Sequence, residues 1–430
     1  MKKKEKVLVL GCGVSGQGAI KLSVSLEKDT FVYDDKLEVK NFLDKEKFKE
    51  VKIVTKRSIL EDIQSYKWIV KSPGIDNRDS FIKEIRSHNS NIISELDFGY
   101  LHLKNNPKII GITGTNGKST TSSLVYYILK TSKLDVSLVG NIGYSFSEAI
   151  ASENEKDFYV IEVSSFQLDD SICIRFDIAA LLNISPNHLD RYKSFYEYVA
   201  SKKKMEKMRK SKSSFIFNSK NEFLSENVKE NIFSDRKNFL DNVGKYSSND
   251  FLFGEHNEDN IAAASTICEA LGVSEKVISE AVSSFSTLDH RLQYVRELDE
   301  VMYYNDSKST TIESTKAALK SFSSPLVWIV GGHDKGNDYN SILDIVKKRV
   351  YAIITLALDN TKILNSFADK FLIYSSKSMQ EAVEVAQSIA WPGMTVLLSP
   401  ACASYDLFKD YQDRGNQFVK EIYKLTKLWT

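Results

Sequence analysis

Short apolar runs that end in glycine-rich or polar loops recur along the whole chain and predict parallel β-strands. The runs are rich in β-branched residues, and segments with helical character follow them, which is typical of buried parallel sheets covered by helices. The expected strands are 6–10, 30–33, 68–71, 108–113, 158–163, 176–184, 301–304, 326–330, 351–356 and 395–398. The pattern predicts an α/β fold built from three segments in series.

The middle segment opens with the most specific motif. A strand at 108–113 runs into residues 114–120, Gly-Thr-Asn-Gly-Lys-Ser-Thr, and then into a helix. The two glycines allow backbone N–H groups to converge on an oxyanion, and the helix adds its positive end. Lys118 and Ser119 are expected to meet nucleotide phosphates and Mg²⁺. The common pattern has a glycine where this chain has Ile112, so the alternative is a tight turn with a solvated lysine.

The first segment, which we end near residue 97, carries a second glycine loop. A strand at 6–10 leads into Gly11-Cys-Gly-Val-Ser-Gly-Gln-Gly18, and Asp34 follows the next strand. Taken alone, this fingerprint predicts a Rossmann unit that binds NAD. A glycine loop at a helix N-terminus accepts any pyrophosphate, and the glycines could also serve close helix packing alone. The loop at 72–74 is expected on the same ligand side of the sheet.

Polar residues near strand ends of the middle segment are candidates for metal and base recognition. Glu162 is the one carboxylate in an apolar strand, where it needs a partner such as Mg²⁺, a lysine or helix N–H groups. His188 and Arg191 follow a third strand, although a lone histidine is more often structural. Asn257 and Asn260 share one face of a helix start, where they serve either as caps or in reading a base edge.

The third segment starts near residue 288 and repeats the order of strand and polar loop. Polar clusters follow its strands at 305–311, 331–336 and 399–404, which favours a face that closes over a ligand. Within the second segment, the lysine-rich stretch 201–212 is expected to be a solvated helix face.

Composition narrows the classes of function. Of 430 residues, 42% are hydrophobic and 27% charged, and the formal net charge is +1, so no overall field recruits nucleic acid or an anionic membrane. The four cysteines are scattered and match neither a zinc spacing nor a disulfide framework. The apolar run at 7–10 is too short for a signal peptide, and no stretch is long enough to span a membrane. We therefore expect a cytoplasmic protein.

With these residues in view, the sequence resembles the Mur ligases of bacterial peptidoglycan synthesis over nearly its whole length. The phosphate loop and the stretch Asn183–Arg191 are similar to the ATP-dependent core that this family shares with folylpolyglutamate synthases. Four further stretches resemble the D-glutamate-adding ligases within the family. They are Glu162–Leu168, His290–Arg291, Asn305–Lys308 and the run from Ser399 to Asn416.

The resemblance implies an α/β enzyme of three domains. A Rossmann-like domain at 1–97 would bind the UDP-linked substrate, a central P-loop-type ATPase domain at 98–287 would bind ATP, and a Rossmann-like domain at 288–430 would bind the amino acid and part of ATP. The carboxylate of UDP-N-acetylmuramoyl-L-alanine would attack ATP to give an acyl phosphate. D-glutamate would then displace phosphate through a tetrahedral intermediate. We expect a monomer that binds neither nucleic acid nor membrane.

The resemblance also assigns site residues by position. The residues expected to bind ATP are Gly114, Thr115, Asn116, Gly117, Lys118, Ser119, Thr120, Asn257, Asn260, Arg291 and Asp306. Those expected to bind the UDP-linked substrate are Ser15, Asp34, Asp35, Lys36, Ser72, Asn141 and His188. Those expected to seat D-glutamate are Thr310, Lys335, Ser404 and Tyr411. The expected catalytic residues are Lys118, Glu162, His188, Lys202 and Lys308. Two Mg²⁺ ions would use Ser119, Glu162, His188 and Lys202, the last as a carbamate.

This chain also departs from the family pattern. Pro186 and Asn187 stand where the family usually has acidic residues, which removes negative charge beside the second metal. The alternatives that stay open are another Mur ligase, a folylpolyglutamate synthase and, from a different class, an NAD-dependent oxidoreductase that rests on the first glycine loop and Asp34.

Overall fold

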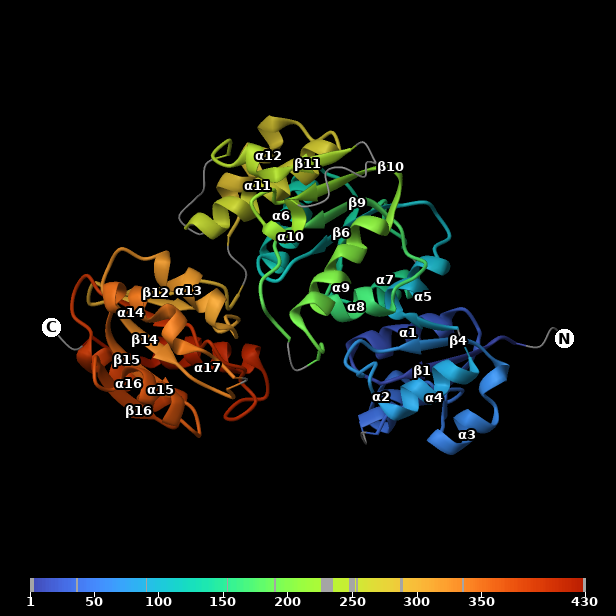
Figure 1. Cartoon of the computed structure of the whole chain (residues 1–430), viewed down its shortest axis with the longest axis horizontal. Helices are drawn as coiled ribbons and strands as arrows, with labels where there is room; N and C mark the ends of the chain where they lie inside the picture. The colour runs from blue at the N-terminus through green and yellow to red at the C-terminus, as the bar shows by residue number, and fades with distance from the viewer. Residues whose placement is uncertain are drawn as a thin grey trace. The chain divides into compact units, whose positions relative to one another are not determined.

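The chain divides into two compact units, which Figure 1 shows with their helices and strands. The first unit holds residues 1–247 and 259–282, and the second holds 248–258 and 283–430. The computed structural model describes residues 4–35, 38–89, 91–152, 154–188, 191–225, 235–246, 252, 254–286, 289–334 and 336–427. Among these, no helix combines the length and the apolar character needed to cross a membrane.

The first sheet is parallel and belongs to the first unit. Its strand order is β3-β2-β1-β4-β5. The strands are β1 (Lys6–Leu10), β2 (Asp29–Tyr33), β3 (Lys52–Ile53), β4 (Tyr66–Lys71) and β5 (Ile92–Ser94). Its helices are α1 (Val14–Ser25), α2 (Glu38–Glu46), α3 (Lys56–Glu61), η1 (Ile63–Ser65), α4 (Ser80–His88) and α5 (Glu95–Leu101). Because β2 and β4 flank β1 on opposite sides, the loops after β1 and β4 open at the switch point where such sheets bind ligands.

The second sheet is also parallel, with the strand order β11-β10-β9-β6-β8-β7. The strands are β6 (Lys108–Thr113), β7 (Val136–Gly140), β8 (Phe158–Glu162), β9 (Phe176–Leu181), β10 (Arg209–Phe217) and β11 (Arg236–Asn238). The helices are α6 (Lys118–Thr131), α7 (Phe146–Ala151), α8 (Ser165–Asp170), α9 (Phe195–Lys207), α10 (Glu222–Ser225), η2 (Phe239–Asn242), α11 (Glu255–Ala270) and α12 (Glu275–Ser284).

The first two sheets share one compact unit because helices between them pack closely. A Cβ atom on Gly18 of α1 would lie 1.7 Å from Ser145 Oγ, the N-cap of α7. Lys21 of α1 also pairs with Glu148 of α7 at 2.8 Å. The last glycine of the first glycine loop therefore serves helix packing, which was one of the alternatives left open by the sequence.

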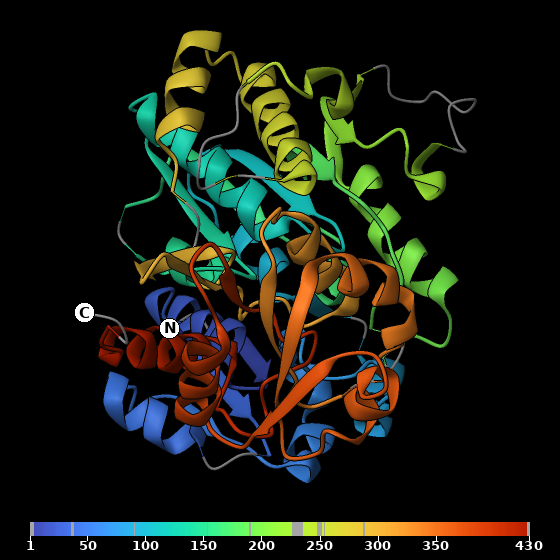
Figure 2. The ribbon, with the colours of Figure 1, turned by 90° about the vertical axis from the view of Figure 1, so that its left-hand side faces the viewer.

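The third sheet forms the core of the second unit, and its strands and helices can be followed in orange and red in Figure 2. The strand order is β12-β13-β17-β14-β15-β16, with an antiparallel β12–β13 hairpin and parallel pairing elsewhere. The strands are β12 (Gln293–Leu298), β13 (Val301–Asn305), β14 (Leu326–Val330), β15 (Val350–Leu356), β16 (Leu372–Ser376) and β17 (Thr395–Leu398). The helices are α13 (Ile312–Lys320), η3 (Tyr339–Ile342), α14 (Leu343–Arg349), α15 (Thr361–Phe367), α16 (Met379–Ile389) and α17 (Tyr411–Lys424).

The predicted α/β class with parallel sheets is confirmed, but one expected element is wrong. The lysine-rich stretch 201–212 is not one helix, because α9 ends at Lys207 and β10 begins at Arg209. The apolar residues Phe215 to Phe217 pair with β9 and are buried, and this pairing draws the preceding lysines into a strand. Within α9 itself, the side chain of Lys202 is buried rather than solvated.

Candidate active site

The phosphate loop lies between β6 and α6, where its backbone requires glycine. Gly117 has φ +81°, and a Cβ atom there would lie 2.3 Å from Asn260 Oδ1 on α11. The same Asn260 oxygen accepts a hydrogen bond from Thr121 Oγ1 at 3.2 Å. The structure therefore brings Asn260 to the phosphate loop. The division between the two units runs through α11, and Asn257, which is buried, falls on the side of the second unit.

Asn183 holds the phosphate loop in shape from the end of the neighbouring strand β9. Its side chain accepts from Asn116 N at 2.9 Å and donates to Asn116 O at 3.1 Å. Its backbone carbonyl accepts from Thr115 N at 2.9 Å, and Thr115 Oγ1 lies 2.9 Å from Tyr198 Oη. Sequence reasoning placed Asn183 in a motif but gave it no role, although an amide at the end of the strand beside the loop is a usable signal.

Lys118 lies at the first position of α6 with its ammonium folded over the loop. Nζ donates to the carbonyl oxygens of Gly114 at 2.9 Å and Thr115 at 2.8 Å. Ser119 and Thr120 follow on the helix and are buried. A helix N-terminus, a left-handed glycine and an ammonium thus lie together, an arrangement typical of anion-binding sites.

Glu162 ends β8, the strand next to β6, opposite Ile112 in the register of the pair. Its side chain is 2% exposed, and Oε1 accepts a hydrogen bond from Asn141 Nδ2 at 2.7 Å. Asn141 follows β7 on the other side of β8. The asparagine expected to meet the sugar end of a substrate therefore orients the carboxylate expected to bind metal.

Lys202 projects from α9 into the interior beneath the loop. It is 1% exposed, and Nζ donates to Thr113 Oγ1 at 3.1 Å. Burial, reinforced by the charge of Lys118, lowers the pKa of Lys202 well below its ordinary value. A lower pKa increases the share of the neutral amine, which is the nucleophilic form of the side chain.

The donor set suits one Mg²⁺ better than a metal cage built from protein alone. Among the described residues, no group of three or more His, Cys, Asp or Glu side chains is arranged to hold a metal ion. Mg²⁺ at a phosphate site commonly uses one or two carboxylates with phosphate and water oxygens, and Ser119 with Glu162 fits that pattern. His188 has φ +55° and lies with its ring 4.9 Å from that of Phe166.

At the first glycine loop, two predicted residues meet the backbone. Asp34 Oδ2 accepts from Cys12 N at 2.6 Å, and Ser72 Oγ donates to Gly11 O at 3.1 Å. Ser15 is half-buried in the first turn of α1, and Asp35 is exposed. Lys36 lies outside the described residues. Asp34 therefore fixes the loop itself, a role that the NAD fingerprint did not predict.

In the second unit, Asp306 follows β13 and is buried among hydrogen-bond donors. It accepts from Ser399 Oγ at 2.8 Å and from Leu292 N at 3.2 Å. Burial raises the pKa of Asp306 to about 6, against the opposing effect of these hydrogen bonds. Its neighbour Asn305 donates to His290 Nδ1 at 2.9 Å. This strand end is therefore a closely bonded polar cluster.

Of the residues expected to seat D-glutamate, Thr310 and Ser404 lie on loops of the same unit, and Tyr411 begins α17. Lys308 Nζ lies 3.7 Å from the centroid of the Tyr411 ring. Ser404 is 2% exposed, while Thr310 and Arg291 are half-buried. Lys335 lies outside the described residues.

Arg414, on α17, connects three loops of the second unit, a role that sequence reasoning missed. Its guanidinium is 1% exposed and bonds to three loops that follow β13, β14 and β17. The acceptors are Ser307 O at 2.9 Å, Ser307 Oγ at 3.0 Å, Cys402 O at 3.1 Å and Gly331 O at 3.4 Å. An arginine followed directly by glycine after a polar loop was visible in the sequence, but its burial was not.

The phosphate loop, the buried carboxylate beside it and the three largely parallel sheets are typical of a nucleotide-binding α/β protein. Residues 112–268 match the family model described as Mur ligase middle domain, and residues 290–402 match the one described as Mur ligase, glutamate ligase domain. Residues 2–80 match the model described as Alanine dehydrogenase/PNT, C-terminal domain, which agrees with a Rossmann-type glycine loop.

Curated relatives extend the similarity over the full chain. Proteins named UDP-N-acetylmuramoylalanine--D-glutamate ligase are 39% identical in Cytophaga hutchinsonii and 37% in Bacteroides fragilis, in both cases over 98% of this chain, and cover 99% and 100% of those proteins. The protein of the same name from Caldanaerobacter subterraneus is 32% identical over 99% of both chains. This chain belongs to the Mur ligase family.

Solved structures agree on the fold. UDP-N-acetylmuramate-alanine ligase from Thermotoga maritima superposes with a TM-score of 0.61 at 15% identity, over 98% of this chain and all of that one. MurF ligase from the same organism gives 0.62 at 16% identity, over 86% of this chain and 92% of that one.

Proposed function

We propose that this chain is an ATP-dependent ligase that adds D-glutamate to UDP-N-acetylmuramoyl-L-alanine. The full-length relatives that carry this name support the choice of substrate. The structural observation that supports it most is the phosphate loop after β6 with the buried Glu162 at the end of the adjacent β8. This pairing suits chemistry at a terminal phosphate.

The first step joins two anions and so depends on fixed positive charge. The carboxylate oxygen of the UDP-linked substrate attacks the γ-phosphorus of ATP, the bond to the β-phosphate oxygen breaks, and an acyl phosphate and ADP result. Lys118 and the backbone N–H groups of the loop would neutralise the charge that develops on the phosphates. Mg²⁺ held by Ser119 and Glu162 would supply further charge neutralisation when bound.

In the second step the amine of D-glutamate attacks the acyl carbon and phosphate leaves through a tetrahedral intermediate. Thr310, Lys335, Ser404 and Tyr411 are proposed to seat the amino acid, and Lys308 to lie near the transferred phosphoryl group. Asn257, Asn260, Arg291 and Asp306 are proposed to bind the remainder of ATP. In the first segment, Ser15, Asp34, Asp35, Lys36 and Ser72 are proposed for the UDP-linked substrate.

Lys202 is proposed to carry a carbamate. The neutral amine would attack the carbon of CO₂, form an N–C bond and lose a proton, which replaces a cation by a metal-directed anion. The burial of Lys202 and its lowered pKa support this, because only the neutral amine reacts. A Lys202→Ala variant should be largely inactive and regain part of its turnover with small added carboxylates. Failure of every such carboxylate to restore turnover would contradict the carbamate.

The experiment that tests the function is amino-acid-dependent phosphate release. With UDP-N-acetylmuramoyl-L-alanine, ATP and Mg²⁺, D-glutamate should stimulate release, whereas L-glutamate and L-alanine should not. Equal stimulation by L-glutamate on a folate substrate would indicate a polyglutamylase. Oxidation of NADH would instead favour an oxidoreductase, the class named by the family model that matches residues 2–80.

We also propose domain limits at residues 97 and 287, a cytoplasmic location, a monomeric state and a second Mg²⁺ that involves His188. The net charge of +1 supports the absence of nucleic-acid or membrane partners. Sedimentation of the purified protein alone and with ATP and Mg²⁺ would test the monomer.

A further inference from the structure

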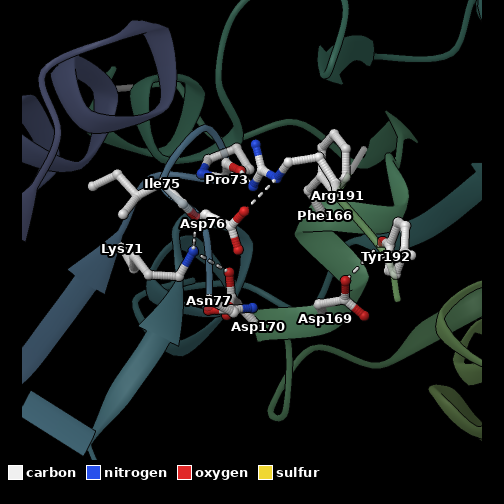
Figure 3. Close-up of a pocket in the computed structure, with 10 residues that line it drawn as sticks. All are labelled: Lys71, Pro73, Ile75, Asp76, Asn77, Phe166, Asp169, Asp170, Arg191 and Tyr192. Atoms are coloured by element: carbon white, nitrogen blue, oxygen red, sulfur yellow. Dashed lines mark hydrogen bonds and ion pairs between the residues drawn. The ribbon is translucent and has the colours of Figure 1, made fainter. Parts of the chain in front are cut away.

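A buried ion pair joins the first two sheets of the first unit beside a ligand loop. Lys71 Nζ, at the end of β4, lies 2.8 Å from Asp170 Oδ2 at the end of α8, and the two side chains are 1% and 2% exposed. Figure 3 shows the pair in a small pocket lined by the end of β4, the loop after it, α8 and the segment that follows β9. The lining residues are Lys71, Pro73, Ile75, Asp76, Asn77, Phe166, Asp169, Asp170, Arg191 and Tyr192.

Lys71 also organises the loop that follows it. Its ammonium donates to Ile75 O at 2.8 Å and to Ser72 O at 3.4 Å. The backbone of residues 72–75 is thus held against the buried Lys71 ammonium. Ser72 Oγ in turn bonds to Gly11 O at 3.1 Å in the first glycine loop. The side chain thus fixes the inner side of a loop that opens at the switch point of the first sheet.

Arg191, in the segment between β9 and α9, holds the same loop from the other side. Its guanidinium donates to Gly74 O at 3.2 Å and to Pro73 O at 3.3 Å, and Nε lies 3.5 Å from Asp76 Oδ2. The group also lies 4.5 Å from the centroid of the Phe166 ring. Figure 3 shows Arg191 beside Pro73 and Asp76. Two cations from different elements therefore fix one loop.

The cations of this pocket bind groups of the protein itself, because each of them already pairs with a carboxylate. Asp170 accepts from Lys71 and, at 2.9 Å, from Arg86, while Asp76 faces Arg191. A buried ion pair contributes little net stability compared with an apolar pair of similar volume. The buried ion pair is therefore better explained by the loop geometry that it fixes than by a contribution to stability.

The segment after β9 links this loop to the phosphate loop. At one end Asn183 bonds to Asn116 of the phosphate loop, and at the other Arg191 bonds to the loop at 72–76. The loop at 72–76 would position the substrate acid, and the phosphate loop would position ATP. Residues of the segment after β9 hydrogen-bond to both loops. Small displacements of reacting groups cost large factors in rate, about a hundredfold for 1 Å.

We propose that Lys71 and Arg191 are positioning residues that fix the loop at 72–76 against the second sheet and so align the UDP-linked substrate with ATP. The proposal rests on the proposed function, in which Ser72 meets that substrate.

Steady-state kinetics of Lys71→Met separate this role from a merely structural one. The KM for UDP-N-acetylmuramoyl-L-alanine should rise about tenfold or more, while the KM for ATP stays within about twofold. Arg191→Lys should move the same KM in the same direction. Lys21→Met is the matched control, because Lys21 also forms a 2.8 Å ion pair between the two sheets, with Glu148, but far along α1 from the loop. It should leave both KM values unchanged.

The double variant Lys71→Met/Asp170→Leu keeps the test valid if Lys71→Met folds poorly. It removes both buried charges, so folding should recover, but it cannot restore the hydrogen bonds to Ile75 O and Ser72 O. The high KM for the UDP-linked substrate should therefore persist. A return of that KM to the wild-type value in the folded double variant, or an equal rise in the KM for ATP, would overturn the proposal.

Hydrogen exchange tests the same loop without turnover and so distinguishes this proposal from the proposed function. The amide of Ile75 bonds to Ser72 O, and that of Ser72 bonds to Leu10 O. Both should exchange faster in the double variant than in the wild type or Lys21→Met. Equal rates in all three proteins would contradict the positioning role even if the wild type turned over another substrate.

Discussion

Glu95 is a carboxylic acid buried where the first two sheets of the first unit meet. It begins α5, is 2% exposed, and accepts a hydrogen bond from Ser147 N at the start of α7. Ser147 Oγ also donates to Glu95 O at 2.9 Å. Burial is the main cause that raises the pKa of Glu95 to about 7. The folded protein therefore favours the protonated acid.

This raised pKa predicts a pH dependence of stability that Glu95→Gln removes. The folded state keeps a proton that the unfolded chain releases above about pH 4.5, so this contribution is complete below that pH and is lost as the pH rises through about 7. The wild type should lose roughly 3 kcal/mol relative to the variant across this window. Urea unfolding of both proteins at several pH values measures the difference, and parallel profiles would contradict the raised pKa.

Lys118 is expected to act on charge that develops during phosphoryl transfer. Lys118→Ala should lower kcat by roughly 10²–10³-fold, because fixed charges in such sites stabilise the transition state more than the ground state. Lys130→Ala, on the exposed end of the same helix, is the control and should have normal turnover. Near-normal turnover of the Lys118 variant would mean that the phosphate loop has been assigned wrongly.

Single residues show where the sequence was informative and where it was not. The need for glycine at position 117 in the loop was predicted from the motif, whereas Gly111, which lies in β6, serves packing. A Cβ atom on Gly111 would lie 2.4 Å from Met205 Cε. The burial of Lys202 was hidden by its lysine-rich surroundings, since local composition carries no information about which face of a helix meets the second sheet.

At the scale of elements, α17 connects the loops proposed to bind the amino acid. Arg414 hydrogen-bonds to the loops after β13, β14 and β17, and the first and last of these loops also carry Thr310 and Ser404. Ser307 Oγ further donates to Tyr411 O at 2.7 Å. One buried guanidinium therefore determines the spacing of three loops.

Arg414→Lys should weaken D-glutamate binding, because lysine keeps the charge but cannot bond to all these loops at once. The KM for D-glutamate should rise about tenfold, with smaller changes for ATP and the UDP-linked substrate. Arg296→Lys is the control, since Arg296 also contacts α17, at Ile422 O, but at its far end. Equal effects of the two substitutions on the KM for D-glutamate would contradict the specific role.

The type of an element was predictable where an apolar strand runs into a loop, and it was uncertain where charged residues predominate in the segment. The strands expected at 6–10, 108–113 and 326–330 agree with β1, β6 and β14. β10 was missed because its first residues are lysine, arginine and serine, and its pairing with β9 depends on residues far away in the sequence.

At the scale of the whole molecule, three sheets were predictable from the repeated pattern of strand and loop. The division into two compact units was not, because it depends on the close packing of α1, α5 and α7 between the first two sheets. The full-length similarity to the Mur ligase family assigns one reaction to these parts. In the mechanism that we propose for this reaction, one substrate acid passes through a phosphorylated state.

Transfer of labelled oxygen tests this central claim most directly. UDP-N-acetylmuramoyl-L-alanine labelled in its terminal carboxylate should, with ATP, Mg²⁺ and D-glutamate, give inorganic phosphate that carries one labelled oxygen for each product molecule. The acyl phosphate predicts this because the attacking carboxylate oxygen leaves with phosphorus. Product formed without ATP, or phosphate without label, would contradict the account.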